Sequence, residues 1–316
     1  MVDLVPQLKR TLPRIVEEAG EEVSSRVIEF FTAEIRNPNT REAYARAVRR
    51  FFRWAAGNGL DLSDIEPPHV AAYVESDERA RATVKQNLAA VRRLFDYLVS
   101  GGALPSNPAA PVKGPKIATP EGKTPILTAE ETRELIDSIV ATEGDRKDVG
   151  RLRDRALIGV MTYSFARSSA ACGLDVGDYF LAGHRRKLRL KEKGGKEHTV
   201  PVHHKLEEYL GAYIEEAGLE DRKEDPLFQS LNRSRELTGR RLIPENARQM
   251  VKRRAEEAGF DPDQVTCHTF RGTGITTYLE NGGDLETAQH IAGHNSATTT
   301  KLYDRRQQNV QQEEIE

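Results

Sequence analysis

Four residues in the C-terminal part of the chain are of types that could together transfer a phosphoryl group: His268, Arg271, His294 and Tyr303. An arginine guanidinium offers a planar fork of donors that matches phosphate oxygens. A histidine can donate or shuttle a proton near neutral pH, and a deprotonated phenol can act as a covalent nucleophile. Cations that neutralise a pentacoordinate phosphorus, together with a nucleophile, are what phosphoryl transfer without a metal requires.

His268 and Arg271 stand three residues apart in the segment CHTFRGTGITTYLENGG, residues 267–283. Positions i and i+3 of a helix lie on one face, so a helix here would direct both side chains into one site. Taken singly, each residue has an ordinary structural explanation: Tyr303 could pack on a helix surface, and His294 could be a hydrogen-bonded core histidine. The order of these residue types along the chain favours the catalytic interpretation.

The segment 267–306 resembles the catalytic end of the phage-integrase family of tyrosine recombinases, with its HxxR, LGH and T..Y motifs. Upstream, YSFARSSAACGLDVGDY (163–179) resembles the family's TGLRxxE block, which implies that Arg167 is the first catalytic arginine. The family has an acidic residue three places after this arginine, whereas here that place is Ala170. Family members use that carboxylate to order the site, so the departure bears on assembly or rate.

The catalytic lysine is implied by a second resemblance. The segment EKGGKEHTVPV (192–202) is similar to the family's GKGxKxRxVPL turn, which points to Lys193, with Lys196 of the same turn as the alternative. This lysine would protonate the departing 5′-oxygen, which is otherwise a poor leaving group. The N-terminal segment NTREAYARAVRRFFRWA (39–55) resembles the opening helix of the family's core-binding domain.

The resemblance implies a metal-free reaction on DNA without any cofactor. Tyr303 would attack the scissile phosphate and form a 3′-phosphotyrosyl link with a free 5′-hydroxyl. Arg167 and Arg271 would hold the non-bridging oxygens. His268 would assist proton movement at the tyrosine, and His294 would donate a hydrogen bond to the phosphate.

The implied function is site-specific recombination by cleaving and rejoining double-stranded DNA, in integration, excision or resolution. Four protomers would assemble as a homo-tetramer on paired sites, and the free protein could be monomeric. One alternative is a catalytically impaired DNA-binding accessory or regulatory protein of the same fold, suggested by Ala170. A type IB topoisomerase is another, which the small two-domain plan and the lysine turn disfavour.

The elements that position these residues are mostly helical. Before residue 104, apolar residues recur at helical spacing over about 8–35, 39–57 and 81–99. Asn39 with Glu42 is the expected cap of the second helix.

A stretch rich in proline and glycine, 104–128, then predicts an extended linker. Beyond it, Thr128 and Glu131 form a predicted capping box. Two strand-like runs around Gly194 and Gly195 predict a hairpin.

The predicted fold is therefore mainly α. A helical N-terminal core-binding domain precedes a mostly α catalytic domain that holds a small antiparallel β-sheet. The expected divisions are a helical extension (1–35), the core-binding domain (36–103), a linker (104–127), the catalytic domain (128–303) and a tail (304–316).

Charge is nearly balanced, with 47 Lys and Arg against 49 Asp and Glu. The sum alone argues mildly against nucleic acid. However, the stretches 181–205 and 233–254 each hold eight basic residues against two acids. We therefore expect DNA phosphates to be contacted by Arg41, Arg49, Arg53, Lys85, Arg92, Arg185, Arg186, Lys196, Arg240, Arg241, Arg248 and Lys252.

The remaining composition bears on location and metal content. Two cysteines form no disulfide framework, and neither CxxC nor a His/Cys cluster at metal-ligand spacing occurs, so no metal site is expected. The chain begins without a signal-peptide pattern, and its longest apolar run is too short to span a bilayer. We expect a cytoplasmic, nucleoid-associated protein without a membrane partner.

Overall fold

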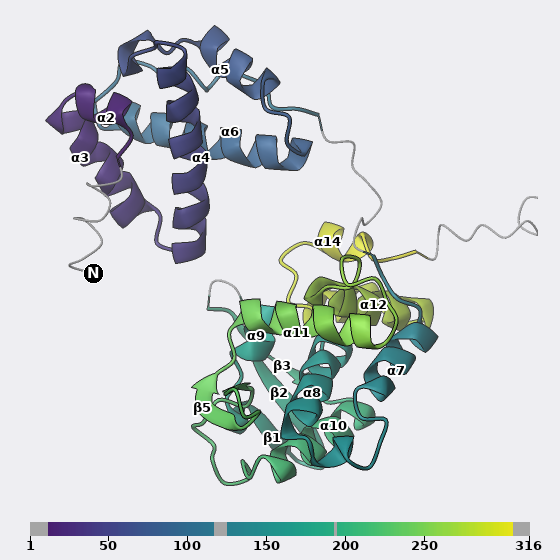
Figure 1. The fold of residues 1–316 in the computed structure, drawn as a ribbon. Helices are drawn as coiled ribbons and strands as arrows, with labels where there is room; N and C mark the ends of the chain where they lie inside the picture. The colour runs from purple at the N-terminus through teal and green to yellow at the C-terminus, as the bar shows by residue number, and fades with distance from the viewer. Residues whose placement is uncertain (1–11, 117–124, 193–194, 306–316) are drawn as a thin grey trace, which may run out of the picture. The chain divides into compact units, whose positions relative to one another are not determined.

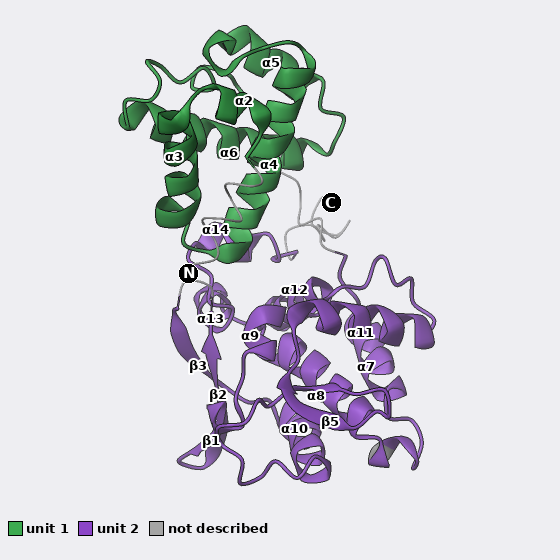
Figure 2. Cartoon of the chain, turned by 60° about the vertical axis from the view of Figure 1, so that its left-hand side comes forward, with its two compact units in different colours: residues 1–120 green, residues 121–316 purple. Residues whose placement is uncertain are grey.

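The computed structural model describes residues 12–116, 125–192 and 195–305. The chain forms two compact units, residues 1–120 and 121–316, and each is described by itself (Figure 2). Among the described residues, none of the helices has the length and apolar character needed to cross a membrane. The fold is mainly helical with small antiparallel sheets, as the sequence predicts.

Unit 1 consists of helices in its described residues (Figure 1). They are α2 (Arg14–Glu18), α3 (Glu21–Glu29), the π-helical turn η1 (Phe30–Glu34), α4 (Pro38–Gly57), the 3-10 turn η2 (Leu62–Asp64), α5 (Pro67–Glu75) and α6 (Arg81–Ser100). The core between α4 and α6 is aromatic: Phe51 and Phe52 meet Phe95 edge to face, with ring centroids 5.9 and 6.2 Å away. This geometry suits the quadrupoles of aromatic rings.

The start of α4 differs from the sequence prediction. The side chain of Asn37 caps the helix by accepting hydrogen bonds from the backbone N–H groups of Asn39 and Thr40, at 3.0 and 3.1 Å. Pro38 fills the first helical position, where its missing N–H costs nothing. The expected cap formed by Asn39 and Glu42 is therefore wrong, because an Asn-Pro pair upstream supplies a stronger start.

Unit 2 alternates helices with short strands (Figure 1). Its helices are α7 (Ala129–Ser138), α8 (Val149–Tyr163), α9 (Ser168–Cys172), α10 (His204–Glu216), α11 (Pro244–Glu257), α12 (Cys267–Glu280), α13 (Leu285–Ile291) and α14 (Ala297–Lys301). Two 3-10 turns are η3 (Asp145–Lys147) and η4 (Val176–Asp178). Thr128 and Glu131 form the predicted capping box of α7.

Helix α8 lies at the centre of unit 2, with α10 and α12 packed on it. Eleven of its residues are buried, including its polar Thr162. Gly274 of α12 lets the two backbones meet, since a Cβ there would lie 2.0 Å from the carbonyl oxygen of Thr162. This close approach fixes α12, the helix that carries His268 and Arg271, directly on the core.

The strands form two sheets rather than the one predicted. Strands β1 (Tyr179–Ala182), β2 (Arg185–Lys191) and β3 (Glu197–Pro201) pair antiparallel in that order. The predicted hairpin is β2–β3, with Leu188 opposite Val200 on the buried face. A separate hairpin of β4 (Gln229–Leu231) and β5 (Leu237–Arg241) was not predicted, because its short polar strands lack an apolar alternation.

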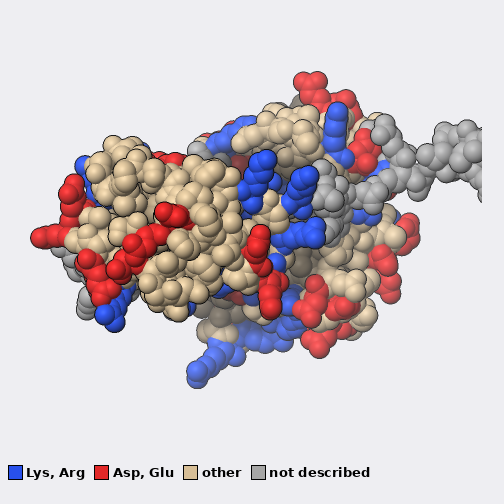
Figure 3. All heavy atoms as spheres, turned by 90° about the horizontal axis from the view of Figure 1, so that it is seen from above, with Lys and Arg blue, Asp and Glu red and all other residues tan. Residues whose placement is uncertain are grey.

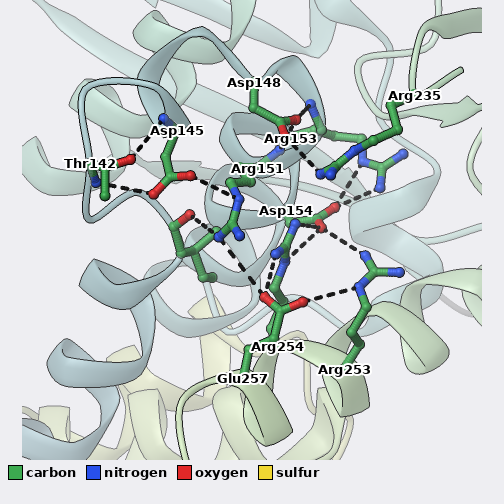
Figure 4. Close-up of polar contacts among 12 residues, drawn as sticks. Thr142, Asp145, Asp148, Arg151, Arg153, Asp154, Arg235, Arg253, Arg254 and Glu257 are labelled. Carbon is green, nitrogen blue, oxygen red and sulfur yellow. Dashed lines mark hydrogen bonds and ion pairs between the residues drawn. The ribbon is translucent and has the colours of Figure 1, made fainter.

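A buried carboxylate joins α8 to α11 (Figure 4). Asp154 is fully buried. Its Oδ1 accepts from Nε and Nη2 of Arg153 at 3.0 and 2.6 Å. Its Oδ2 accepts from Nε and Nη2 of Arg254 at 3.0 and 2.8 Å, and from Arg253 at 3.3 Å. Arg254 also donates to Glu257 at 2.6 Å. Both carboxylate oxygens of Asp154 accept hydrogen bonds from guanidinium groups, so the negative charge of Asp154 is tolerated inside the core.

We expect Asp154→Ala to destabilise unit 2 by about 3–5 kcal/mol, because it leaves buried guanidinium groups without their carboxylate. The measurement is amide hydrogen exchange of α8 peptides, since the single tryptophan, Trp54, lies in unit 1. Asp263→Ala is the matched control: it breaks an ion pair with Lys252 in which Asp263 is 84% exposed, worth about 0–1 kcal/mol. Equal losses in the two variants would contradict a structural role for Asp154.

Candidate active site

Helix α12 carries His268 and Arg271 in its first two turns, on one face as the spacing predicts. Thr266 caps the helix, and its hydroxyl accepts from the backbone N–H of Thr269 at 3.3 Å. In return the backbone N–H of Thr266 donates to the hydroxyl of Thr269 at 3.0 Å. This reciprocal cap sets the helix start and so the direction in which both catalytic candidates point.

Arg271 is the most deeply buried cation of the site, with 1% of its surface exposed. Its Nη1 donates to the carbonyl oxygen of Phe165, and its Nη2 donates to that of Ala292 at 2.7 Å. Burial, followed by repulsion from Arg167, lowers the pKa of Arg271 to about 10, so it stays charged at neutral pH. Among the described residues its Nε has no hydrogen-bond partner.

The residue Phe165 aims its carbonyl at Arg271 through an unusual backbone. Its φ of +53° lies in the left-handed region that side chains other than glycine rarely adopt. The turn follows directly after α8 and leads into α9, whose N-cap is Arg167. The strained residue Phe165 thus follows the central helix, supplies an acceptor for Arg271 and lies two residues before Arg167, the first candidate arginine.

His294 is buried and neutral. Its Nε2 accepts from Nη2 of Arg271 at 2.7 Å, which leaves the ring proton on Nδ1 to be donated to the hydroxyl of Thr300 at 2.9 Å. Burial and the nearby charge of Arg271 lower the pKa of His294 to about 4. Gly293, with φ of +59°, makes the turn that brings this ring in from the end of α13.

Tyr303 and His268 form a hydrogen-bonded pair, with 2.8 Å between Oη and Nε2. Burial raises the pKa of Tyr303, so the phenol is protonated and donates. Burial and the charges of Arg271 and Arg167 lower the pKa of His268, so its ring is neutral and accepts. The ring of Tyr303 is parallel to that of His294 within 12°, at 6.0 Å between centroids. The candidate nucleophile and a neutral imidazole are therefore hydrogen-bonded to each other in the field of two arginines.

Arg167 contacts a carboxylate that sequence analysis did not assign to the site. Its Nη1 donates to Oε2 of Glu192, the residue that follows β2. Asp175, the acid that follows α9 in the sequence, pairs instead with Arg241 and Lys191. The only sequence signal for Glu192 was its place in the lysine turn.

Of the two candidate lysines, the structure describes only Lys196. Lys193 lies outside the described residues. Lys196 is exposed, and its carbonyl oxygen accepts from the backbone N–H of Glu192 at 2.7 Å, which closes the turn between β2 and β3. Thr300, which belongs to the T..Y motif but was given no role, is the further residue that the structure adds to the site.

The twelve expected phosphate contacts fall into groups. Five are engaged with the protein's own acceptors: Arg41, Arg92, Arg241, Arg248 and Lys252. Arg186 lies over the ring of Tyr179, 5.0 Å from its centroid. The other six have no ion pair within the described residues: Arg49, Arg53, Lys85, Arg185, Lys196 and Arg240. Figure 3 shows acidic and basic side chains interspersed on the face it presents.

Comparison with known proteins assigns the chain to one family along most of its length. Residues 125–309 match the phage integrase family, and residues 29–102 match the phage integrase N-terminal SAM-like domain. Tyrosine recombinase XerD of Corynebacterium glutamicum is 32% identical over 280 residues, which cover 84% of this chain and 86% of the relative.

Two solved structures share the fold. A XerH site-specific recombinase bound to palindromic difH substrate, in a post-cleavage complex, superposes with a TM-score of 0.72 at 21% identity, covering 99% of this chain and 92% of that one. A lambda integrase tetramer bound to a Holliday junction gives 0.66 at 19% identity, with 88% and 75% covered.

We expect the His294 ring to titrate near pH 4, with its proton on Nδ1 at neutral pH. Since the folded pKa lies below the ordinary 6.5, its contribution to stability is present above pH 6.5. That contribution, about 3 kcal/mol, is lost as the pH falls from 6.5 through 4.

Nitrogen-15 NMR of the histidine rings reports both the tautomer and the midpoint, and amide exchange of α12 reports the stability. His294→Asn serves to assign the signal. A ring that titrates near 6.5 would contradict the buried, neutral state.

Proposed function

The chain belongs to the phage integrase family, and on this premise we propose that Tyr303 is the nucleophile of its reaction. As a member it is a site-specific tyrosine recombinase, an enzyme that breaks and rejoins DNA. The observation that carries the residue assignment is the 2.8 Å hydrogen bond from Tyr303 Oη to His268 Nε2, next to two arginines. In the proposed reaction Oη bonds to the scissile phosphorus, and the bond from phosphorus to the 5′-oxygen breaks.

His268 acts as the general base. The raised pKa of Tyr303 means that the phenol does not ionise by itself at neutral pH. The lowered pKa of His268 keeps its ring neutral and ready to accept the proton as the new bond forms. The hydrogen bond is already at the distance that a general base needs.

The two arginines neutralise the phosphate. Both N–H groups of Arg271 Nη2 are used by Ala292 and His294, and one N–H of Nη1 is used by Phe165. Its buried Nε and the second N–H of Nη1 are therefore the donors that remain for a non-bridging oxygen. The side chain of Arg167 is 36% exposed and reaches the same site from α9. Fixed cations of this kind stabilise charge that develops in the transition state.

His294 is proposed to position Arg271. From the sequence we expect it to donate a hydrogen bond to phosphate, but both of its ring nitrogens are engaged, by Arg271 and Thr300. Because the ring also lies parallel to that of Tyr303, it supports the nucleophile and the arginine together.

A lysine of the β2–β3 turn supplies the proton for the leaving 5′-oxygen, with Lys193 as the first candidate and Lys196 as the second. The product is a 3′-phosphotyrosyl link that conserves the bond energy. A 5′-hydroxyl of another strand then attacks this link, the proton returns to Tyr303, and the backbone is rejoined.

Double-stranded DNA is the partner. The six cations without an ion pair, together with Arg186, are proposed as the phosphate contacts, because none of these side chains is paired with a carboxylate in the described residues.

Four protomers are proposed to act together on two sites, as in the lambda integrase tetramer on a Holliday junction. A protein that works on chromosomal or phage DNA in this way is proposed to act in the cytoplasm, at the nucleoid. The alternative of an impaired accessory protein rested on Ala170, and the hydrogen-bonded Tyr303–His268 pair supports the enzyme instead.

We expect Tyr303→Phe to abolish covalent adducts with DNA while leaving non-covalent binding unchanged, because only the attacking oxygen is removed. A library of nicked duplexes, in which cleavage traps the intermediate, is incubated with the protein, and adducts are resolved on denaturing gels. Tyr213→Phe is the matched control, since this buried tyrosine of α10 stacks on Phe228 and touches none of the site residues named above. Adducts of Tyr303→Phe at the level of the unaltered protein would exclude Tyr303 as the nucleophile.

The lysine assignment is tested with a leaving group that needs no proton. We expect Lys193→Ala to cleave ordinary DNA about 100-fold or more slowly, because an alkoxide must leave unprotonated. A 5′-bridging phosphorothiolate should restore its rate, since a thiolate leaves readily. Lys196→Ala removes a proposed phosphate contact, so any loss of rate should be the same on both duplexes. The reverse pattern would transfer the role to Lys196, and no rescue in either variant would mean that neither lysine is the acid.

A further inference from the structure

Arg167 is held by one acidic side chain within the described residues. Its Nη1 donates to Oε2 of Glu192, whose side chain is 3% exposed while that of Arg167 is 36% exposed. The buried member of the pair therefore fixes the exposed one. Since Arg167 must meet a phosphate oxygen, the residue that sets its direction matters for the reaction.

Position 170 offers Arg167 no such partner. Arg167 is the N-cap of α9, so position 170 follows it by one helical turn and faces the same side. Ala170 is buried at 3% exposure and brings only a methyl group. The acid that the family's motif has at this place is missing, and an acid stands instead at 192, where the motif of the lysine turn has glycine.

Glu192 is fixed from its other side by the loop that carries His294. A Cβ at Gly293 would lie 3.1 Å from Cγ of Glu192 and 3.2 Å from Cε1 of His198. His198 in turn shares a hydrogen bond of 3.0 Å with the carbonyl oxygen of Ile291. The bare backbone of Gly293 is thus what lets the stem of Glu192 pass beside this loop.

The charge of Glu192 also acts on the second arginine. Burial and Arg167 lower the pKa of Arg271, and Glu192 is the first group that raises it again. The other carboxylate oxygen, Oε1, is buried without a hydrogen-bond partner in the described part of the chain. A carboxylate so placed is costly unless its pairing with cations compensates.

We propose that Glu192 is a positioning residue that orders Arg167 for the phosphate and replaces a carboxylate missing at position 170. This inference rests on the proposed role of Arg167 as a phosphate ligand. The acid has moved from α9 to the end of β2, so it approaches the guanidinium from the strand side. Arg167 is then coupled directly to the turn that carries the candidate lysines.

The kinetic test is a double-mutant cycle on the nicked duplex that yields the most adduct with the unaltered protein. We expect Glu192→Ala to slow adduct formation at saturating DNA about 100-fold with unchanged DNA affinity, because a misdirected ligand weakens the transition state. In an Arg167→Ala background the same change should cost nothing further, since Glu192 acts through Arg167. Glu197→Ala, an exposed acid on the same hairpin, is the control that should keep the full rate.

The relocation is tested by moving the acid back. A170E/E192A should recover at least 10-fold of the lost rate, whereas A170E alone should not exceed the unaltered protein. The guanidinium signals of Arg167 in nitrogen-15 NMR, assigned with Arg167→Lys, give a readout without DNA. We expect restricted Nη rotation in the unaltered protein, free rotation in E192A and restricted rotation again in A170E/E192A. If the double variant does not fold, Glu192→Gln should show intermediate restriction and rate.

The outcomes separate this inference from the proposed function. No adduct with any duplex for the unaltered protein would defeat the recombinase chemistry, and the NMR signals would still decide the role of Glu192. Adducts together with Arg167 signals that E192A leaves unchanged would overturn the inference alone. Faster cleavage by E192A would also overturn it, because Glu192 would then block the phosphate position. Additive losses in the cycle would assign Glu192 a role independent of Arg167.

Discussion

The burial of one guanidinium organises the site. Arg271 is almost inaccessible to solvent, so its charge requires acceptors from the protein itself. These acceptors come from the turn after α8, from the end of α13 and from the loop before α14. Satisfying Arg271 therefore draws three segments together around α12. The proposed nucleophile belongs to the same assembly, since the carbonyl oxygen of Tyr303 accepts from Thr276 of α12 at 3.1 Å.

Unit 2 contains two kinds of buried charge, and their contrast separates scaffold from site. Asp154 is surrounded by guanidinium groups that satisfy both of its oxygens, so nothing remains for a ligand. Arg271 keeps an unpartnered Nε in the described residues. Burial, followed by repulsion from Arg167, lowers its pKa, so an added negative charge would stabilise it. A phosphate would supply that charge. The fully paired group has the character of a structural element, whereas the incompletely paired one fits the phosphate ligand proposed above.

Helical spacing and capping patterns in the sequence predicted the helices and which residues share a helix face. They did not predict the partners that side chains meet through tertiary contacts. Positions i and i+3 placed His268 and Arg271 correctly, because a helix converts spacing into direction. Glu192 could not be assigned from its spacing, since it meets Arg167 only after β2 packs beside α9. The hairpin of β4 and β5 was missed for a similar reason: Gln229 and Thr238 are held by side-chain hydrogen bonds across the pair rather than by an apolar pattern.

Most of the basic side chains counted along the sequence have partners within the protein. In the stretch 233–254, six of the eight basic side chains are paired within the protein: Arg235, Arg241, Arg248, Lys252, Arg253 and Arg254. A cation already paired with a carboxylate releases few counterions when it meets a phosphate. The basic stretch therefore serves mainly to hold α11 and the β4–β5 hairpin on the core. In the proposed function, electrostatic attraction to DNA then comes from the smaller set of side chains without an ion pair in the described residues.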